Sequence, residues 1–120
     1  MVRQSTRFRR RQLFEEAVEV IAREYAADGL SLASVSGIIA TSPRQLQRAF
    51  AETGGTSFRR ELQRVRMERA ALLLRTGSMP VARVASAVGY RQPAQFAKAF
   101  RRHHGRPPSA FRGTADQLAA

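Results

Sequence analysis

The 120-residue sequence contains no cysteine. It therefore has no disulfide, no cysteine-ligated zinc finger, no thiol nucleophile and no cysteine acceptor for alkyl-transfer DNA repair, and it suits a reducing cytoplasm. No apolar run approaches the roughly 20 residues of a membrane-spanning helix. No apolar stretch follows the basic N-terminus as it would in a signal peptide. We therefore predict a cytoplasmic protein without a membrane partner.

Acidic residues are scarce. The sequence has 9 of them against 21 lysine and arginine residues, which gives a formal net charge of +12. No acid lies between Arg69 and Ala115. Such a charge indicates a polyanionic partner, either nucleic acid or an anionic membrane surface. The plain alternative is a solvated basic surface in an arginine-rich protein, because every basic residue except Lys98 is arginine.

Catalytic motifs are missing as well. The sequence has no P-loop and no glycine-rich dinucleotide turn, and its basic half offers no histidine paired with an acid. His103 and His104 are adjacent, so they face different sides of a helix and lack the i, i+4 spacing of a metal pair. We predict that the chain is not an enzyme and that it has no catalytic residue, no metal site and no cofactor.

Helical periodicity follows a basic N-terminal stretch. Residues 1–11 hold five arginines and little apolar material, and are predicted to form a flexible basic arm, either merely disordered or bound to a minor groove or phosphate. Apolar side chains then recur at three and four, at Phe14, Ala17, Val18, Ile21 and Tyr25. Gly29 is the predicted left-handed C-cap of this helix. Its opposite face carries Glu15, Glu16 and Glu19, which would repel a polyanion.

Two short helices come next, with a tight turn between them. Ser31 is a predicted N-cap, and the apolar positions of its helix are Leu32, Val35 and Ile39. Ser42 is the N-cap of the second helix, with Pro43 at N1, where its missing N–H costs nothing. The buried positions of this second helix are Leu46, Ala49 and Phe50, and Gly54 and Gly55 end it. Residues from about 31 to 52 are therefore predicted to form a helix-turn-helix.

A longer helix, capped by Ser57, is predicted over about residues 57–75. Its apolar positions are Phe58, Leu62, Val65, Ala70, Leu73 and Leu74, and Gly77 follows its end. The helix-turn-helix pattern then returns over about residues 80–103. Val35 matches Val84 at an offset of 49, whereas Phe50 matches Phe100 at an offset of 50, so the second turn is one residue longer.

The sequence thus predicts an all-α fold of about seven helices, with two helix-turn-helix subdomains joined by a long central helix. Its main domain covers residues 12–112, and its last short helical turn packs Phe111. Residues 113–120 form a polar C-terminal tail. The central helix, at 1.5 Å per residue, would be roughly 27 Å long. Recognition helices about 34 Å apart meet successive major-groove turns, so one chain could contact both as a monomer.

The second helix of each motif would enter the major groove. With Leu46 and Phe50 inward, a rotation of 100° per residue turns Arg44 and Arg48 outward, with Gln45 and Gln47 beside them. Arginine pairs with guanine and glutamine with adenine. The matching face of the second motif carries Ala94, Lys98 and Arg101, with Gln95 beside them, and offers fewer base-pairing donors. We therefore predict that the first motif supplies more base specificity and the second more backbone anchoring.

These residues bring the chain close to a known family. Over about residues 14–112 it resembles the DNA-binding domain of AraC/XylS-type regulators. The matching motifs are Leu46-x-Arg48-x-Phe50, Gly55-x-Ser57-Phe58, Arg66-Met67-x-x-Ala70-x-x-Leu73-Leu74, Val81-x-x-Val84-Ala85-x-x-Val88-Gly89-Tyr90 and Phe96-x-x-x-Phe100-Arg101-x-x-x-Gly105-x-x-Pro108-Ser109-x-Phe111-Arg112. The resemblance implies binding near promoters, usually to activate transcription by contacting RNA polymerase.

The resemblance completes the set of predicted site residues. The predicted base contacts are Arg44, Gln45, Gln47, Arg48, Pro93, Ala94, Gln95 and Lys98. The predicted phosphate contacts are Ser42, Arg91, Gln92, Arg101 and Arg102. The sequence departs from the family at three positions. The family usually has a small apolar residue in place of Ser36, glycine in place of Ala40, and serine or aspartate near Gln92.

The expected function is a sequence-specific, nucleoid-associated transcription regulator that binds double-stranded DNA. Its main rival is a nonspecific or architectural DNA-binding protein, since +12 favours phosphate contacts whatever the outward side chains do. A basic amphipathic membrane binder would need open apolar faces, which these helices use for one another. Met1 favours a stand-alone member, monomeric on DNA, over a piece of a longer regulator.

Overall fold

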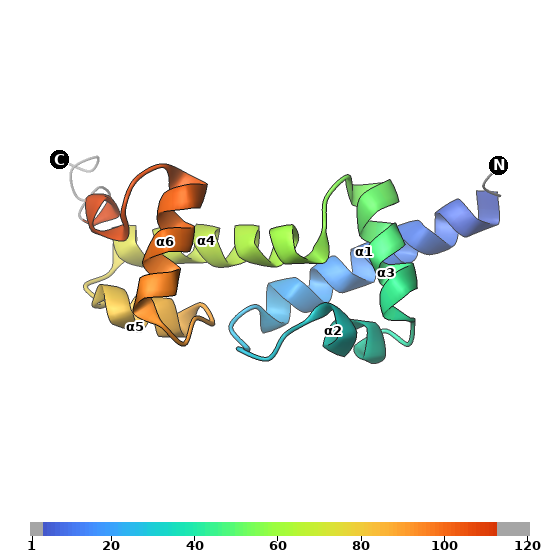
Figure 1. Cartoon of the computed structure of the whole chain (residues 1–120), viewed down its shortest axis with the longest axis horizontal. Coiled ribbons are helices and arrows are strands. Elements are labelled where there is room, and N and C mark those ends of the chain that lie inside the picture. The colour runs from blue at the N-terminus through green and yellow to red at the C-terminus, as the bar shows by residue number, and fades with distance from the viewer. Residues whose placement is uncertain (1–3, 113–120) are drawn as a thin grey trace. The chain divides into compact units, whose positions relative to one another are not determined.

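A computed structural model describes residues 4–112, so the predicted tail at residues 113–120 lies outside the described part. The elements in chain order are α1 (Gln4–Glu24), α2 (Leu32–Ile38), α3 (Pro43–Ala49), the π-helical turn η1 (Phe50–Gly54), α4 (Phe58–Thr76), α5 (Val81–Ala87), α6 (Pro93–His104) and the 3₁₀ turn η2 (Pro108–Phe111). The described residues contain no strand. This confirms the predicted all-helical fold, and Figure 1 shows that α3 and α6 each follow a short helix through a tight turn.

The chain divides into two compact units. The first takes the residues up to Tyr25 together with Gly29–Gln63, and the second takes Ala26–Asp28 and the chain from Arg64 onwards. Each unit contains one helix-turn-helix, α2 with α3 in the first and α5 with α6 in the second. The long helix α4 begins in the first unit and ends in the second.

Polar caps set where the first motif's helices begin. Ser31 caps α2 through a capping box, in which its side chain accepts from the N–H of Ser34 and the Ser34 hydroxyl accepts from the N–H of Ser31. The Ser42 hydroxyl accepts from the N–H of Gln45 at 3.1 Å, and Pro43 follows at the first helical position. These side chains satisfy N–H groups that have no partner inside a helix.

The first unit has an aromatic core centred on Phe50. The rings of Phe14 and Phe58 pack nearly perpendicular to the Phe50 ring, at centroid distances of 5.1 and 5.8 Å. Leu46, Ala49 and Phe50 are fully buried, which confirms the predicted inward stripe. α3 is therefore held by its apolar face, and its other side chains are left at the surface.

The second unit has its own aromatic core. The ring of Phe100 lies 5.7 Å from Phe96 and 4.9 Å from Phe111, and the His104 ring nitrogen Nε2 lies 3.0 Å from the carbonyl oxygen of Met67. These contacts fix α6 against α4 and η2. The predicted last turn that packs Phe111 is confirmed.

The prediction of a flexible basic arm at residues 1–11 is wrong for residues 4–11, which form the first turns of α1. Arg10 is only 8% exposed and forms an ion pair with Glu52 in η1. Its alkyl stem is buried like an apolar side chain, and its guanidinium is paired with the Glu52 carboxylate. A pattern that counts arginine as polar therefore places the start of this helix too late.

Two further details of α1 differ from expectation. Its fully buried apolar side chains are Leu13, Ala17, Val20 and Ile21, whereas Phe14, Val18 and Tyr25 are only partly buried. The buried stripe is thus rotated about the helix axis from the predicted one. α1 also ends at Glu24, and Gly29 does not have a left-handed backbone, so it is not a helix cap.

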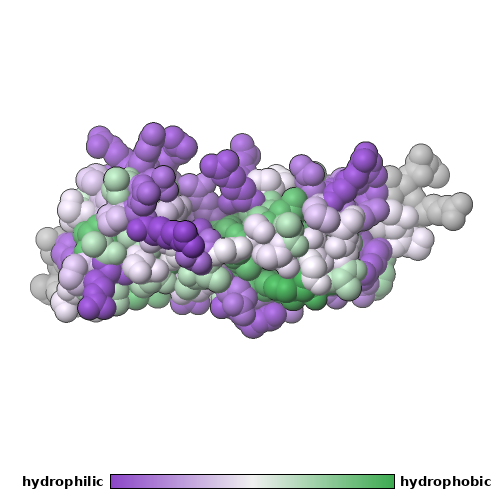
Figure 2. All heavy atoms as spheres, turned by 60° about the horizontal axis from the view of Figure 1, so that its bottom comes forward, coloured by the Kyte–Doolittle hydropathy of each residue, from purple (hydrophilic) through white to green (hydrophobic). Residues whose placement is uncertain are grey.

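Apolar surface is limited. The large hydrophobic side chains exposed among the described residues are Phe8, Ile38, Leu72 and Met79. In Figure 2, hydrophilic side chains cover much of the visible face and hydrophobic ones show in patches between them. No helix in the described range combines the length and apolarity needed to cross a bilayer.

Candidate nucleic-acid interface

The first recognition helix presents every predicted base-contacting side chain to solvent. Arg44, Gln45, Gln47 and Arg48 are exposed, whereas Leu46 on the opposite face is fully buried. The Ser42 hydroxyl oxygen accepts the capping bond of α3, which leaves its O–H to donate to another group such as a phosphate. This face combines two guanidinium groups with two amides, the groups that pair with guanine and adenine edges in the major groove.

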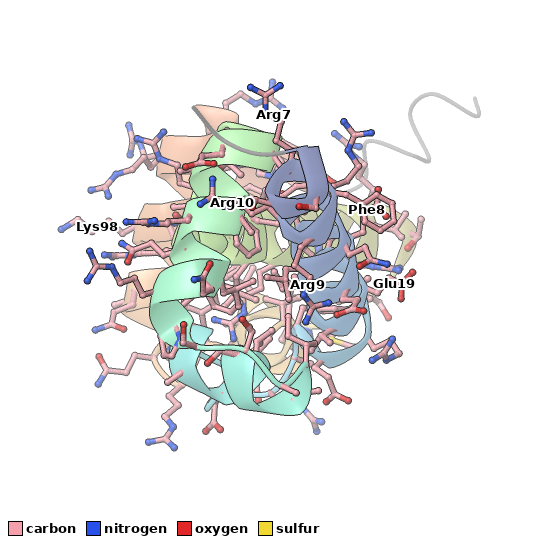
Figure 3. All side chains as sticks on the ribbon, turned by 90° about the vertical axis from the view of Figure 1, so that its right-hand side faces the viewer. Arg7, Phe8, Arg9, Arg10, Glu19 and Lys98 are labelled. Atoms are coloured by element: carbon pink, nitrogen blue, oxygen red, sulfur yellow. The ribbon has the colours of Figure 1, made fainter. Side chains whose placement is uncertain are left out.

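The second recognition helix has the same construction with different chemistry. Pro93, Ala94, Gln95 and Lys98 are exposed, and Phe96 is fully buried behind them. Figure 3 shows Lys98 extending away from the ribbon. Gln92 forms no side-chain cap on α6, in contrast to Ser42 on α3. Of these side chains only Gln95 and Lys98 carry hydrogen-bond donors, so this face has fewer groups for base pairing.

The predicted phosphate contacts Ser42, Gln92, Arg101 and Arg102 are exposed. Arg91 is exposed too, but it has a protein partner. Its Nε donates to the Asp28 carboxylate at 2.6 Å, and this bond holds the pKa of Asp28 below its usual range. The bond uses Nε, which leaves the Nη donors of Arg91 for a phosphate.

Asp28 is a partner of a predicted phosphate contact that the sequence analysis missed. It lies 63 residues before Arg91, and no periodicity or motif connects the two. The segment Ala26–Asp28 is fixed in the second unit by Arg66, whose Nη2 donates to the carbonyl oxygen of Ala27 at 3.0 Å. The Asp28 carboxylate beside this predicted phosphate contact orients the Arg91 guanidinium. It also reduces the net positive charge of the surface around Arg91.

Two short helices joined by a tight turn, present twice and each with exposed basic and amide side chains on its second helix, define a helix-turn-helix DNA-binding domain. A family model described as a helix-turn-helix domain matches residues 35–114. Together with the relatives below, this match shows that the chain belongs to the AraC-type family of helix-turn-helix transcription regulators. Proteins of this family bind DNA and are not enzymes.

Three comparisons illustrate the likeness. The chain is 31% identical over 102 residues to the arabinose operon regulatory protein of Escherichia coli, a match that covers 85% of the chain and 35% of that protein. It superposes with a TM-score of 0.82 and 32% identity on the C-terminal domain of AraT, a response regulator from Geobacillus stearothermophilus, covering 85% of the chain and 84% of that domain. With the DNA-binding domain of AdpA, a global transcriptional factor solved in complex with a target DNA, the TM-score is 0.79, the identity 25% and the coverage 88% and 94%.

The chain is much shorter than the regulators it matches. It spans 27%, 38% and 35% of the lengths of three curated relatives. The shared part is the DNA-binding domain, as the neighbouring structures indicate. Activities of the longer proteins therefore do not pass to this chain by likeness alone.

Proposed function

We propose that this protein is a sequence-specific transcription regulator, with an activating role, that inserts α3 and α6 into successive major-groove turns of promoter DNA. The observation that carries the proposal is the pair of exposed polar faces on two helices, each braced by fully buried apolar side chains on its opposite face. A rigid helix with outward arginine, glutamine or lysine has the shape and the donors that major-groove contacts require.

The two helices have different roles in this proposal. α3 provides base specificity through Arg44, Gln45, Gln47 and Arg48. α6 contributes base contacts from Pro93, Ala94, Gln95 and Lys98, with more of its binding energy in phosphate contacts. Ser42, Arg91, Gln92, Arg101 and Arg102 bind the backbone. Phosphate contacts position the protein, and base contacts select the sequence.

The proposed partner besides DNA is RNA polymerase. Membership of the AraC-type family supports a contact between this protein and RNA polymerase beside the promoter. Two recognition helices in one chain support a monomer on an asymmetric site, since dimeric proteins obtain two such helices from two subunits. The site of action would be the nucleoid in the cytoplasm.

The experiment is a selection from random oligonucleotides with nonspecific competitor DNA at about 150 mM salt. The proposal predicts a preferred site with two half-motifs about one helical turn apart, bound at least about a thousandfold more tightly than nonspecific DNA. If no sequence is enriched and affinity follows only salt concentration, the protein is a nonspecific or architectural DNA binder instead.

A further inference from the structure

The N-terminal half of α1 is fixed against the first recognition motif. Arg10 pairs with Glu52 of η1, and the Phe14 ring meets the Phe50 ring edge-on at 5.1 Å. The approach is close, because a Cβ added at Gly54 would lie 2.4 Å from Cε1 of Phe14. These contacts hold α1 beside η1 at Arg10 and Phe14.

This packing creates a groove between α1 and the beginning of α3. The groove has a volume of about 310 Å³, and its lining residues are Ser5, Thr6, Arg9, Leu13, Thr41 and Gln45. All of them belong to the first unit. Gln45 is one of the proposed base contacts, so the groove begins at a residue that faces the major groove and continues to Arg9. Figure 3 shows Arg9 on α1.

The chemistry of the groove suits a phosphate. Arg9 is exposed and carries a guanidinium that can bind two phosphate oxygens at once. Ser5, Thr6 and Thr41 add hydroxyl donors, and none of the lining residues is acidic. A second hollow, lined by Arg7, Arg10, Arg11, Glu52 and Thr53, contains an acid that already pairs with Arg10. Of these two hollows beside the start of α1, the Arg9 groove is the one without a carboxylate among its lining residues.

The position of the groove selects DNA as the source of that phosphate. A side chain that contacts a base edge lies inside the major groove, which is about 12 Å wide and bordered by the two phosphate backbones. Arg9 lines the same groove as Gln45. When Gln45 contacts a base, the guanidinium of Arg9 therefore faces the phosphate backbone that borders the bases contacted by α3. Such a contact adds affinity and fixes the orientation of the helix.

We propose that Arg9, with the hydroxyls of Ser5, Thr6 and Thr41, binds a DNA backbone phosphate next to the bases contacted by α3. The proposal extends the DNA interface beyond the two helix-turn-helix motifs to the start of α1. It rests on the proposed function, because α3 must lie in the major groove for Arg9 to meet the backbone.

The test compares Arg9→Gln with Arg23→Gln. Both remove one charge from an exposed position of α1, but Arg23 lies near its other end and outside the groove. Affinity is measured on the selected site and on nonspecific DNA across a salt series, after circular dichroism has shown equal helix content. We expect Arg9→Gln to weaken binding about fivefold and Arg23→Gln to have a smaller effect. The slope of log K against log salt should fall by about 0.9 in Arg9→Gln.

A second measurement locates the contact. Ethylation of single phosphates should weaken the parent protein at one phosphate bordering the bases contacted by α3, and Arg9→Gln should be insensitive to that ethylation. Equal affinities and slopes for the two variants would overturn the proposal. Failure of the proposed function is recognised separately, because it appears as absence of a preferred sequence in the parent protein. In that case the two variants still differ on nonspecific DNA if Arg9 binds phosphate.

Discussion

Ala40 and Gly89 occupy the same position in the two helix-turn-helix motifs, and both have a left-handed backbone, with φ of 57° and 98°. The hydrogen bonds around them are also the same. The N–H of Thr41 donates to the carbonyl of Ser36, and the N–H of Tyr90 donates to the carbonyl of Ala85, each at 2.9 Å. This is the Schellman end of a helix, where glycine is usual. The first turn therefore carries a strain that the second avoids.

Replacing Ala40 by glycine should stabilise the first unit. A left-handed residue with a Cβ costs roughly 1–2 kcal/mol, and the extra freedom of glycine in the unfolded chain takes back about 0.4–1 kcal/mol. The strain outweighs the entropy, so Ala40→Gly should raise the free energy of unfolding by about 0.5–1 kcal/mol. Urea denaturation measures it. Gly89→Ala is the matched control and should destabilise by a similar amount, and a loss of stability in Ala40→Gly would show that Ala40 is not strained.

Removal of the Glu52 carboxylate should destabilise the first unit because Arg10 is 8% exposed and would keep its charge without the opposite charge that it pairs with. We expect Glu52→Gln to cost about 1–3 kcal/mol in free energy of unfolding. Glu68→Gln is the control, since its pair with Arg64 is an exposed contact one helical turn apart at 3.0 Å and should contribute under about 0.5 kcal/mol. Equal effects in the two variants would mean that Arg10 does not depend on Glu52.

Alanine substitutions at Arg48 and Lys98 should separate the two recognition helices. Arg48→Ala should reduce discrimination between the selected site and single-base variants by about 1–3 kcal/mol at one base pair. Lys98→Ala should reduce this discrimination less and should weaken binding to all sequences more evenly, because most of the binding energy proposed for α6 comes from phosphate contacts, which carry no sequence information. Competition binding against a panel of single-base variants measures both. Equal loss of discrimination in the two variants would contradict the proposed division of roles.

Acid should weaken the second unit through His103. Partial burial, with the adjacent His104 as a second cause, lowers the pKa of His103 below its usual value. As the pH falls, the unfolded chain binds the proton first, so stability is complete above the usual pKa, near 6.5, and declines as the pH drops through it. The decline ends below the folded pKa. Unfolding free energies between about pH 8 and pH 5 should therefore change less in His103→Gln than in the parent. If the free energy of unfolding of His103→Gln fell more steeply with acid than that of the parent, the pKa of His103 would be raised by folding and not lowered.

Local chemistry explains which parts of the fold could be predicted. Ser42 and Pro43 mark the start of α3 by rules that involve only neighbouring residues, and Leu46 and Phe50 mark its inward face by helical spacing. The exposure of the predicted base-contacting residues follows directly, because the outward face is fixed once the inward one is known. The turn between α2 and α3 and the turn between α5 and α6 can be predicted because they too depend on residues close together in the sequence.

The parts that could not be predicted depend on long-range contacts. Arg10 belongs to the buried side of α1 only because Glu52 reaches it from 42 residues away. Asp28 lies beside Arg91 in a segment that Arg66 also binds, through the carbonyl of Ala27. Hydrophobic periodicity contains no information about such pairs, since it treats each charged side chain as surface.

The separate aromatic cores have a consequence for how this protein can change over time. Phe50 supports α3 within the first unit, and Phe100 supports α6 within the second. A substitution that alters one recognition face lies in a different unit from the aromatic core that supports the other. Under the proposed function, a lineage can thus drift toward a new operator one half-site at a time, with binding to the unchanged half retained while the other is replaced.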